Sequence, residues 1–261
     1  MKKALPLLLV LSLGVSALAD HTVTMRTTMS DPNMASMKMT TVTRTKNKRQ
    51  RVEDTTEMSG FKMNTVSLVM CDLEQTAQLD PENKIYTVSS MNPVASFSPD
   101  GEPAKPKKGT GTMSTHVKVQ DKGVEKVAQV NARHWIVDTQ TKGTGCIGTF
   151  DYKSTREFWT SDLPAFYCPT LAGTWTEQTF NDCQVKNTLT GDAEKYHQSM
   201  RHEVVKEIIY IDGKPSMTRE MVDFSTALLD ESLFSLDGYR KVSEEEFQAA
   251  QQQKMMKMYQ Q

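Results

Sequence analysis

Histidines are the residues of this chain with the widest use in catalysis, but they are dispersed, and no recognised catalytic motif accompanies them. Gly143–Gly148 matches G-x-G-x-x-G by letter. A dinucleotide site needs a helix after this motif, whereas residues 149–155 are typical of a strand. The sequence therefore predicts neither an enzyme nor a cofactor, and we expect surface or hydrogen-bonded histidines at His21, His116, His134, His197 and His202.

Methionine is the most unusual component, with 17 residues in the chain. One group lies between Met25 and Met39, and a second comprises Met255, Met256 and Met258. Thioethers are soft ligands that suit Cu(I), and flexible methionines also build adaptable apolar surfaces. Metal-binding methionine tracts usually contain histidines, and only His21 lies near the first group. We therefore favour an apolar surface and keep copper binding as an alternative.

Four cysteines without a C-x-x-C pair predict two disulfides rather than a metal site. We expect a hairpin between residues 148 and 163 that turns at Ser154–Glu157 and brings its flanking cysteines together. This predicts a Cys146–Cys168 bridge and, by elimination, a Cys71–Cys183 bridge. A Cys168–Cys183 bridge stays open as the alternative.

The first residues have the pattern of a secretory signal peptide. Lys2 and Lys3 precede an apolar run, and Ala17-Leu18-Ala19 is a small-x-small cleavage site. The run is shorter than the roughly 20 residues that span a bilayer. We expect cleavage after Ala19, no transmembrane segment afterwards, and a periplasmic or secreted mature protein that begins at Asp20.

The charge balance excludes a typical nucleic-acid-binding protein. The formal net charge of −1 becomes about −3 when Lys2 and Lys3 are removed, because 29 basic residues then face 32 acidic ones. Nucleic-acid binding would require a clustered basic excess. We expect no nucleic-acid partner.

Apolar and polar residues alternate through most of the chain, which predicts one wet and one buried face of an antiparallel sheet. Asp212–Lys214 is typical of a hairpin turn, and the proline- and lysine-rich residues 92–111 predict a long mobile loop. Residues 20–242 should form one β domain. Ser243 and Glu246 form a capping-box pattern at the start of an amphipathic helix and tail over residues 243–261.

Three segments resemble the periplasmic lipoprotein carrier-like (LolA/LolB-like) superfamily. Residues 64–88 contain Asp80-Pro81-Glu82-Asn83-Lys84-Ile85-Tyr86, which is similar to a Leu-x-Pro-x-x-Lys-x-Tyr line of these domains. Ala132–Trp135 and Ser225–Val242 match a later strand and the closing segment. An exported branch in Gram-negative bacteria also has the aromatic-Asp-Leu-Pro run, here Trp159–Pro164.

The resemblance implies an open half-barrel, a single strongly curved antiparallel sheet whose apolar concave face is covered by short helices or loops. Carriers of this type hold acyl chains on that face, so it implies a non-enzymatic protein that binds a lipid or another apolar ligand. The alternatives are a copper-binding protein and an envelope module that contacts an envelope protein partner without a small ligand. We place in the core or on the cavity wall Val66, Leu68, Met70, Val117, Val119, Trp135 and Trp159.

Overall fold

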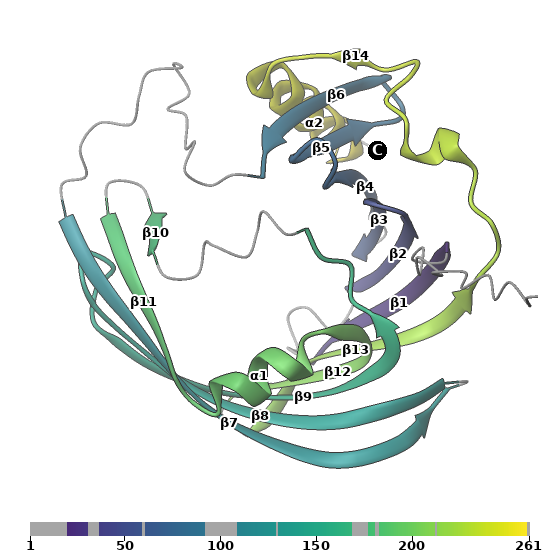
Figure 1. The fold of residues 1–261 in the computed structure, drawn as a ribbon. Coiled ribbons are helices and arrows are strands. Elements are labelled where there is room, and N and C mark those ends of the chain that lie inside the picture. Colours follow the sequence, from purple (N-terminus) through teal and green to yellow (C-terminus); the bar gives the residue numbers. More distant parts are fainter. Residues whose placement is uncertain are drawn as a thin grey trace, which may run out of the picture.

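The computed structural model describes residues 20–30, 37–58, 61–91, 109–128, 130–168, 177–180, 183–211 and 213–259. Its strands form one 14-stranded sheet in the order β10-β11-β7-β8-β9-β12-β13-β1-β2-β3-β4-β5-β6-β14. Figure 1 shows that this sheet is open and bends strongly around an inner side. The prediction of a mainly β fold with a single curved, open sheet is confirmed.

The strands differ widely in length, and the longest ones lie in the β7–β9 region. Their bounds are β1 His21–Met29, β2 Lys38–Lys46, β3 Arg49–Met58, β4 Phe61–Met70, β5 Gln75–Asp80, β6 Ile85–Ser90, β7 Gly109–Val127, β8 Val130–Gly145, β9 Phe150–Pro164, β10 Glu177–Phe180, β11 Cys183–Gly191, β12 His202–Ile211, β13 Lys214–Ser225 and β14 Arg240–Lys241.

Most neighbouring strands pair antiparallel, as the alternating pattern predicts. β12 and β13 form the hairpin expected around residue 213. Two pairings near the sheet edges are parallel: β11 with β7, and β14 with β6. β1 pairs with β13, which joins segments almost 200 residues apart in the chain and brings the two ends of the domain side by side.

The predicted hairpin turn at Ser154–Glu157 is wrong, because β9 runs without interruption from Phe150 to Pro164. At about 3.3 Å per residue, a strand of 15 residues is about 50 Å long. Cys146 precedes this strand and Cys168 follows it, so the two cysteines lie near opposite ends and cannot meet. Both predicted pairings are therefore wrong, and so is the alternative: the bridges are Cys71–Cys168 and Cys146–Cys183.

The start of β7 explains the second bridge. Gly109 is paired with Cys183 on one side, while the backbone amide of Cys146 donates to the carbonyl of Thr110 on the other. The preceding Gly145 has φ +79°, and a Cβ there would lie 2.4 Å from the Thr110 oxygen. Glycine is needed for this close turn, which holds Cys146 beside Cys183.

Among the described residues, two α-helices and one 3-10 helix pack on the sheet. They are α1 Ala193–Ser199, α2 Glu244–Tyr259 and η2 Glu231–Phe234. Figure 1 shows α1 on the inner side of the curve above β7–β9 and η2 outside β3 and β4. The sequence did not predict α1.

The C-terminal helix is confirmed in position, and the described side chains of its first half have a packed apolar face. The Ser243 hydroxyl accepts from the Glu246 amide at 3.1 Å, as the capping pattern predicts. Phe247 packs with Ile85 and Val242. Farther along, Met255 is 41% exposed. The amphipathic character is therefore weaker than expected.

Some sequence predictions concern residues outside the described part of the chain. These are the signal peptide up to Ala19 and residues 92–108 of the expected loop. The last three residues of that loop prediction, 109–111, belong to β7.

Candidate ligand-binding face

The seven predicted site residues are all buried, but they do not surround one cavity. Val66, Leu68 and Met70 belong to a cluster around Phe234 of η2. Val119 and Trp135 belong to a cluster with Phe158, against which Tyr196 of α1 packs. Val117 is 1% exposed on the same side of β7 as Val119. Trp159 lies in a third cluster, together with Met25 and Met221.

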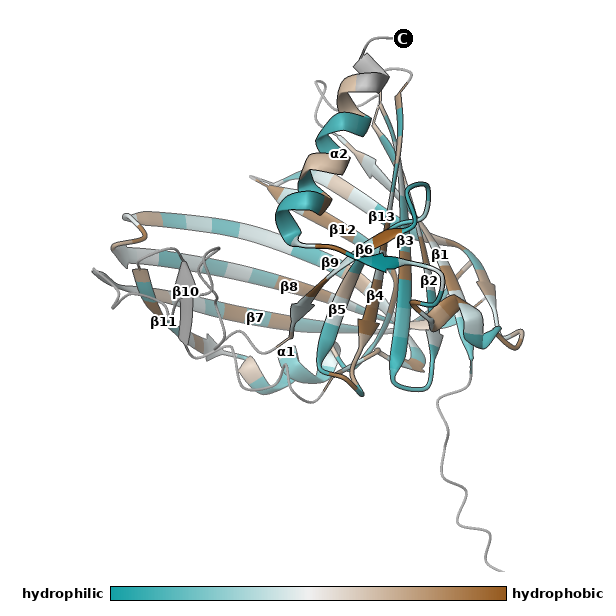
Figure 2. Cartoon of the chain, turned by 90° about the horizontal axis from the view of Figure 1, so that it is seen from above, coloured by the Kyte–Doolittle hydropathy of each residue, from teal (hydrophilic) through white to brown (hydrophobic). Residues whose placement is uncertain are grey.

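The first of these clusters lies on the outer face of the sheet. Residues 229–239 cross β3–β6 there, and Arg49 and Arg51 of β3 donate to the carbonyls of Phe234 and Leu233 at 2.9 and 3.2 Å. Figure 2 shows brown, apolar colouring on β4. Val66, Leu68 and Met70 are therefore core residues beneath this crossing segment and do not line the concave face.

Five methionines of three adjacent strands share one face of the sheet. Met25 is directly opposite Met221, and Met29 is directly opposite Met217. Met39 is opposite Thr27, which lies between Met25 and Met29 on β1. Directly opposite side chains have Cβ atoms about 4.5–5.5 Å apart, so the thioethers are neighbours. We call these five residues, Met25, Met29, Met39, Met217 and Met221, the methionine face.

The methionine face lies on the same side of the sheet as α1. Thr27 is paired with Arg219, Arg219 with Glu207, and Glu207 with Phe158. Paired residues point to the same face, and Phe158 belongs to the cluster that α1 contacts. The methionines therefore project to the inner, concave side seen in Figure 1.

The exposure of the methionines changes along the strands. Met25 and Met221 are 4% and 6% exposed. Met29, Met39 and Met217 are half-buried. On the same face, Met63 at the far end of β4 is 40% exposed. The face thus opens toward one end of the strands.

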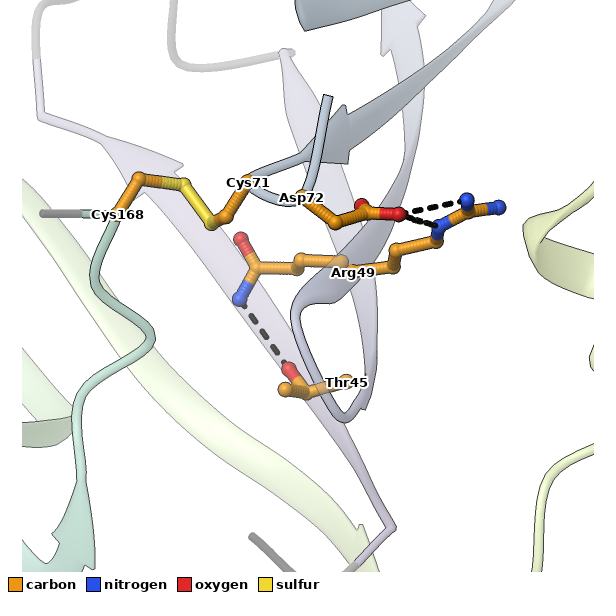
Figure 3. Close-up of a disulfide and its surroundings, with 6 residues drawn as sticks. Thr45, Arg49, Cys71, Asp72 and Cys168 are labelled. Carbon is orange, nitrogen blue, oxygen red and sulfur yellow. Dashed lines mark hydrogen bonds and ion pairs between the residues drawn. A yellow bond between two sulfur atoms is a disulfide. The ribbon is translucent and has the colours of Figure 1, made fainter. Parts of the chain in front are cut away.

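The other end of the concave face is crossed by residues 164–168, which we call the strap. Pro164 is paired with His202 at the start of β12, and the Ala165 amide donates to the Arg201 carbonyl at 2.9 Å. The strap ends at Cys168, whose bridge to Cys71 anchors it to the turn after β4 (Figure 3). Next to Cys71, Asp72 pairs with Arg49 at 2.8 Å.

The strap connects two parts of the curved sheet by a shorter path than the sheet itself. Its four Cα steps reach at most about 14 Å, and the bridged Cα atoms are 5.2 Å apart. Along the sheet, β12 and β4 are separated by five strand spacings, or about 24 Å. The bridge can close only because the sheet bends, and it fixes that curvature.

Charged groups share this face with the methionines, because Arg219 lies between Met217 and Met221 on β13 and is paired with Glu207. The Glu207 carboxylate, with a side chain 7% exposed, binds Arg156 and lies 3.5 Å from the Arg219 guanidinium. Burial raises the pKa of the Glu203 carboxyl, although electrostatic interactions with His21 and Arg219 oppose this. The concave face is therefore apolar around the methionines and ionic beside them.

A second polar cluster surrounds Trp159, which packs in one core cluster with Met25 and Met221. The His134 ring stacks on the Trp159 indole with centroids 4.3 Å apart, and Lys206 lies 4.4 Å from that ring. His134 Nε2 is 2.8 Å from Glu157 Oε1. These contacts satisfy the groups locally and explain why Trp159 is core.

Sequence reasoning noted Met25 and Met29 but missed Met217 and Met221 as their partners. The alternation of apolar and polar residues identifies β1 and β13 separately. It does not show that they pair, because the two strands lie near opposite ends of the chain. In the described residues, no group of three His, Cys, Asp or Glu side chains could hold a metal ion. The same part of the chain contains no helix long and apolar enough to cross a membrane.

The two disulfides are typical of proteins from oxidising, extracytoplasmic compartments. In comparisons with known proteins, no family model and no curated protein sequence matches this chain.

Proposed function

We propose that this chain is a non-enzymatic binding protein of the periplasm that holds a flexible apolar ligand, such as a lipid acyl chain, against the methionine face. The observation that carries the proposal is the direct pairing of Met25 with Met221 and of Met29 with Met217 on the concave side. Unbranched, polarizable methionine side chains adapt to ligands without a fixed shape.

The arrangement around the methionines supports an acyl chain. The half-buried Met29, Met39 and Met217 give a ligand access, and the buried Met25 and Met221 lie on the same face one row farther along, beyond Thr27 and Arg219. Burial of a chain contributes about 0.8 kcal/mol per CH₂. Arg219 beside these methionines is a ligand for an acidic headgroup. The carrier-like sequence segments agree with this role.

The test is saturable binding of a fluorescent fatty acid to the exported, oxidised protein. Met29→Gln/Met39→Gln should weaken binding roughly tenfold, about 1.4 kcal/mol. Thr28→Gln/Lys38→Gln is the matched control, because these adjacent residues point to the other face. Binding that is absent, or equally weak in both variants, would contradict the proposal.

Copper binding is the second candidate, and the same observation favours it. Paired thioethers on adjacent strands are soft ligands for Cu(I). Titration of the protein with Cu(I) and a competing chelator, with the same two variants, separates this function from lipid binding. A folded protein that takes up neither probe supports the third account, an envelope module that contacts another protein.

A further inference from the structure

A polar groove of about 490 Å³ lies across β7, β8, β9 and β12. Its volume is within the range of small-molecule sites, about 300–1,000 Å³. Neither the methionine face nor the strap contributes to it. It is lined by His116, Lys118, Asp138, Thr139, Gln140, Lys153, Ser154, Thr155, Tyr210 and Gly213.

The strand register brings the principal side chains to one face in two rows. In the first row, Lys118 pairs with Asp138, Asp138 with Thr155, and Thr155 with Tyr210. In the second, His116 pairs with Gln140 and Gln140 with Lys153. Both rows have the opposite parity to Val117 and Val137, so the groove lies on the face away from α1.

Within the part of the chain that the structure describes, two lysines of the groove form no close ion pair, although Lys118 is paired with Asp138 across the strands and Lys153 interacts electrostatically with Asp151. Lys142, one row farther along, shows the difference, because it pairs with Asp151 at 3.4 Å. The two ammonium groups come from β7 and β9 and flank the polar side chains of β8.

Between these cations lie groups that suit hydroxyls. Asp138 Oδ1 accepts from the Thr155 hydroxyl at 2.7 Å, which leaves Oδ2 as an acceptor. Gln140 uses its Nε2 to donate to Asp151 at 2.8 Å, so its Oε1 is an acceptor as well. At the β12 side, the Tyr210 hydroxyl donates to Glu157 Oε2 at 2.9 Å and thereby fixes the ring.

We propose that this groove binds an anionic saccharide. The two lysines recognise the acidic group, the acceptors of Asp138 and Gln140 recognise sugar hydroxyls, and the fixed Tyr210 ring offers an apolar plane to the ring carbons. A simple anion would use only the lysines and would be repelled by Asp138. An apolar ligand would leave the lining groups without partners, at a cost in free energy.

The experiment is calorimetric titration of the exported protein with trigalacturonate at about 10 mM ionic strength, where the Debye length is about 30 Å. Lys118→Gln/Lys153→Gln should weaken binding roughly tenfold. Lys62→Gln/Lys195→Gln removes the same charge from exposed positions elsewhere and should leave the affinity unchanged. Failure of trigalacturonate to saturate, or an equal loss in both variants, would overturn the proposal.

Asp138→Ala distinguishes a saccharide site from a plain anion site. Loss of a hydroxyl acceptor should weaken trigalacturonate binding, whereas loss of a negative charge should strengthen the binding of inorganic phosphate. Tighter trigalacturonate binding in Asp138→Ala, or phosphate binding as strong as that of trigalacturonate in the unaltered protein, would overturn the assignment. Thermal melts of each variant confirm that it is folded.

Discussion

Removal of the strap bridge by Cys71→Ser/Cys168→Ser should destabilise the protein and open the methionine face. The bridge closes a loop of 97 residues, and chain entropy gives about 4–5 kcal/mol for a loop of this length. For a chain of this size, about 1 kcal/mol corresponds to about 2–4 °C in Tm. We therefore expect the melting temperature to fall by roughly 10–15 °C.

Cys146→Ser/Cys183→Ser is the matched control, because that bridge closes a loop of 37 residues and contributes a similar free energy, about 4 kcal/mol. It ties β11 to the turn after β8, away from the strap. Circular dichroism melts of both variants measure the stability. Peroxide oxidation followed by peptide mass spectrometry measures access to Met29, Met39 and Met217.

Only the strap variant should oxidise these methionines faster than the unaltered protein at a temperature where both variants are folded. Equal oxidation in the two variants would refute the reasoning, because it would show that lost stability and not the strap controls access. An unchanged melting temperature in Cys71→Ser/Cys168→Ser would refute the estimated magnitude.

Three further outcomes are expected. Burial raises the pKa of Glu203, so the contribution of this carboxyl to stability favours folding at low pH and is lost as the pH rises through the folded-state pKa. Glu203→Gln should therefore raise Tm by about 2–4 °C at pH 7 and leave Tm unchanged at pH 3. Thermal melts between these two pH values measure the difference. Phe234→Ala empties a site that is 2% exposed and should cost about 3–5 kcal/mol in urea unfolding, whereas the equally apolar but 92% exposed Leu228 should tolerate alanine. Ser243→Ala removes the bond to the Glu246 amide and should cost about 1 kcal/mol, read as faster amide exchange at the start of α2.

The local residue pattern predicted much of the architecture, because the position of a strand or helix depends on residues that are neighbours in the sequence. Alternation in residues 23–29 and 117–119 identifies half-buried strands, and the capping residue Ser243 marks the start of α2. The same pattern does not show whether a buried residue lies on the inner or the outer face of the sheet. Val66, Leu68 and Met70 therefore proved to be core on the outer face, where residues 229–239 cover them.

The disulfides were missed because a cysteine pairing is a long-range property. A hairpin over residues 148–163 is compatible with the composition of that segment, yet β9 continues because it pairs with both β8 and β12 along its length. Cys183 then reaches Cys146 only through the parallel pairing of β11 with β7. Parallel pairing of distant strands has no signature in either strand alone.

The polar groove was missed for a related reason. Lys118, Asp138, Lys153 and Tyr210 come from four strands, and each is an ordinary wet-face residue in its own alternating segment. Only the register places them in two rows. The methionines were noticed for their number, but their assembly on one face depends on the pairing of β1 with β13.

Photolabelling with a diazirine-bearing fatty acid tests the central claim most directly. The oxidised, exported protein is irradiated with the probe, digested and mapped by peptide mass spectrometry. The account predicts saturable labelling of peptides that contain Met29, Met39 and Met217, with competition by unlabelled palmitate. Labelling confined to other exposed apolar residues, for example the 92% exposed Leu228 between β13 and η2, or no competition by palmitate, would contradict a ligand-binding methionine face.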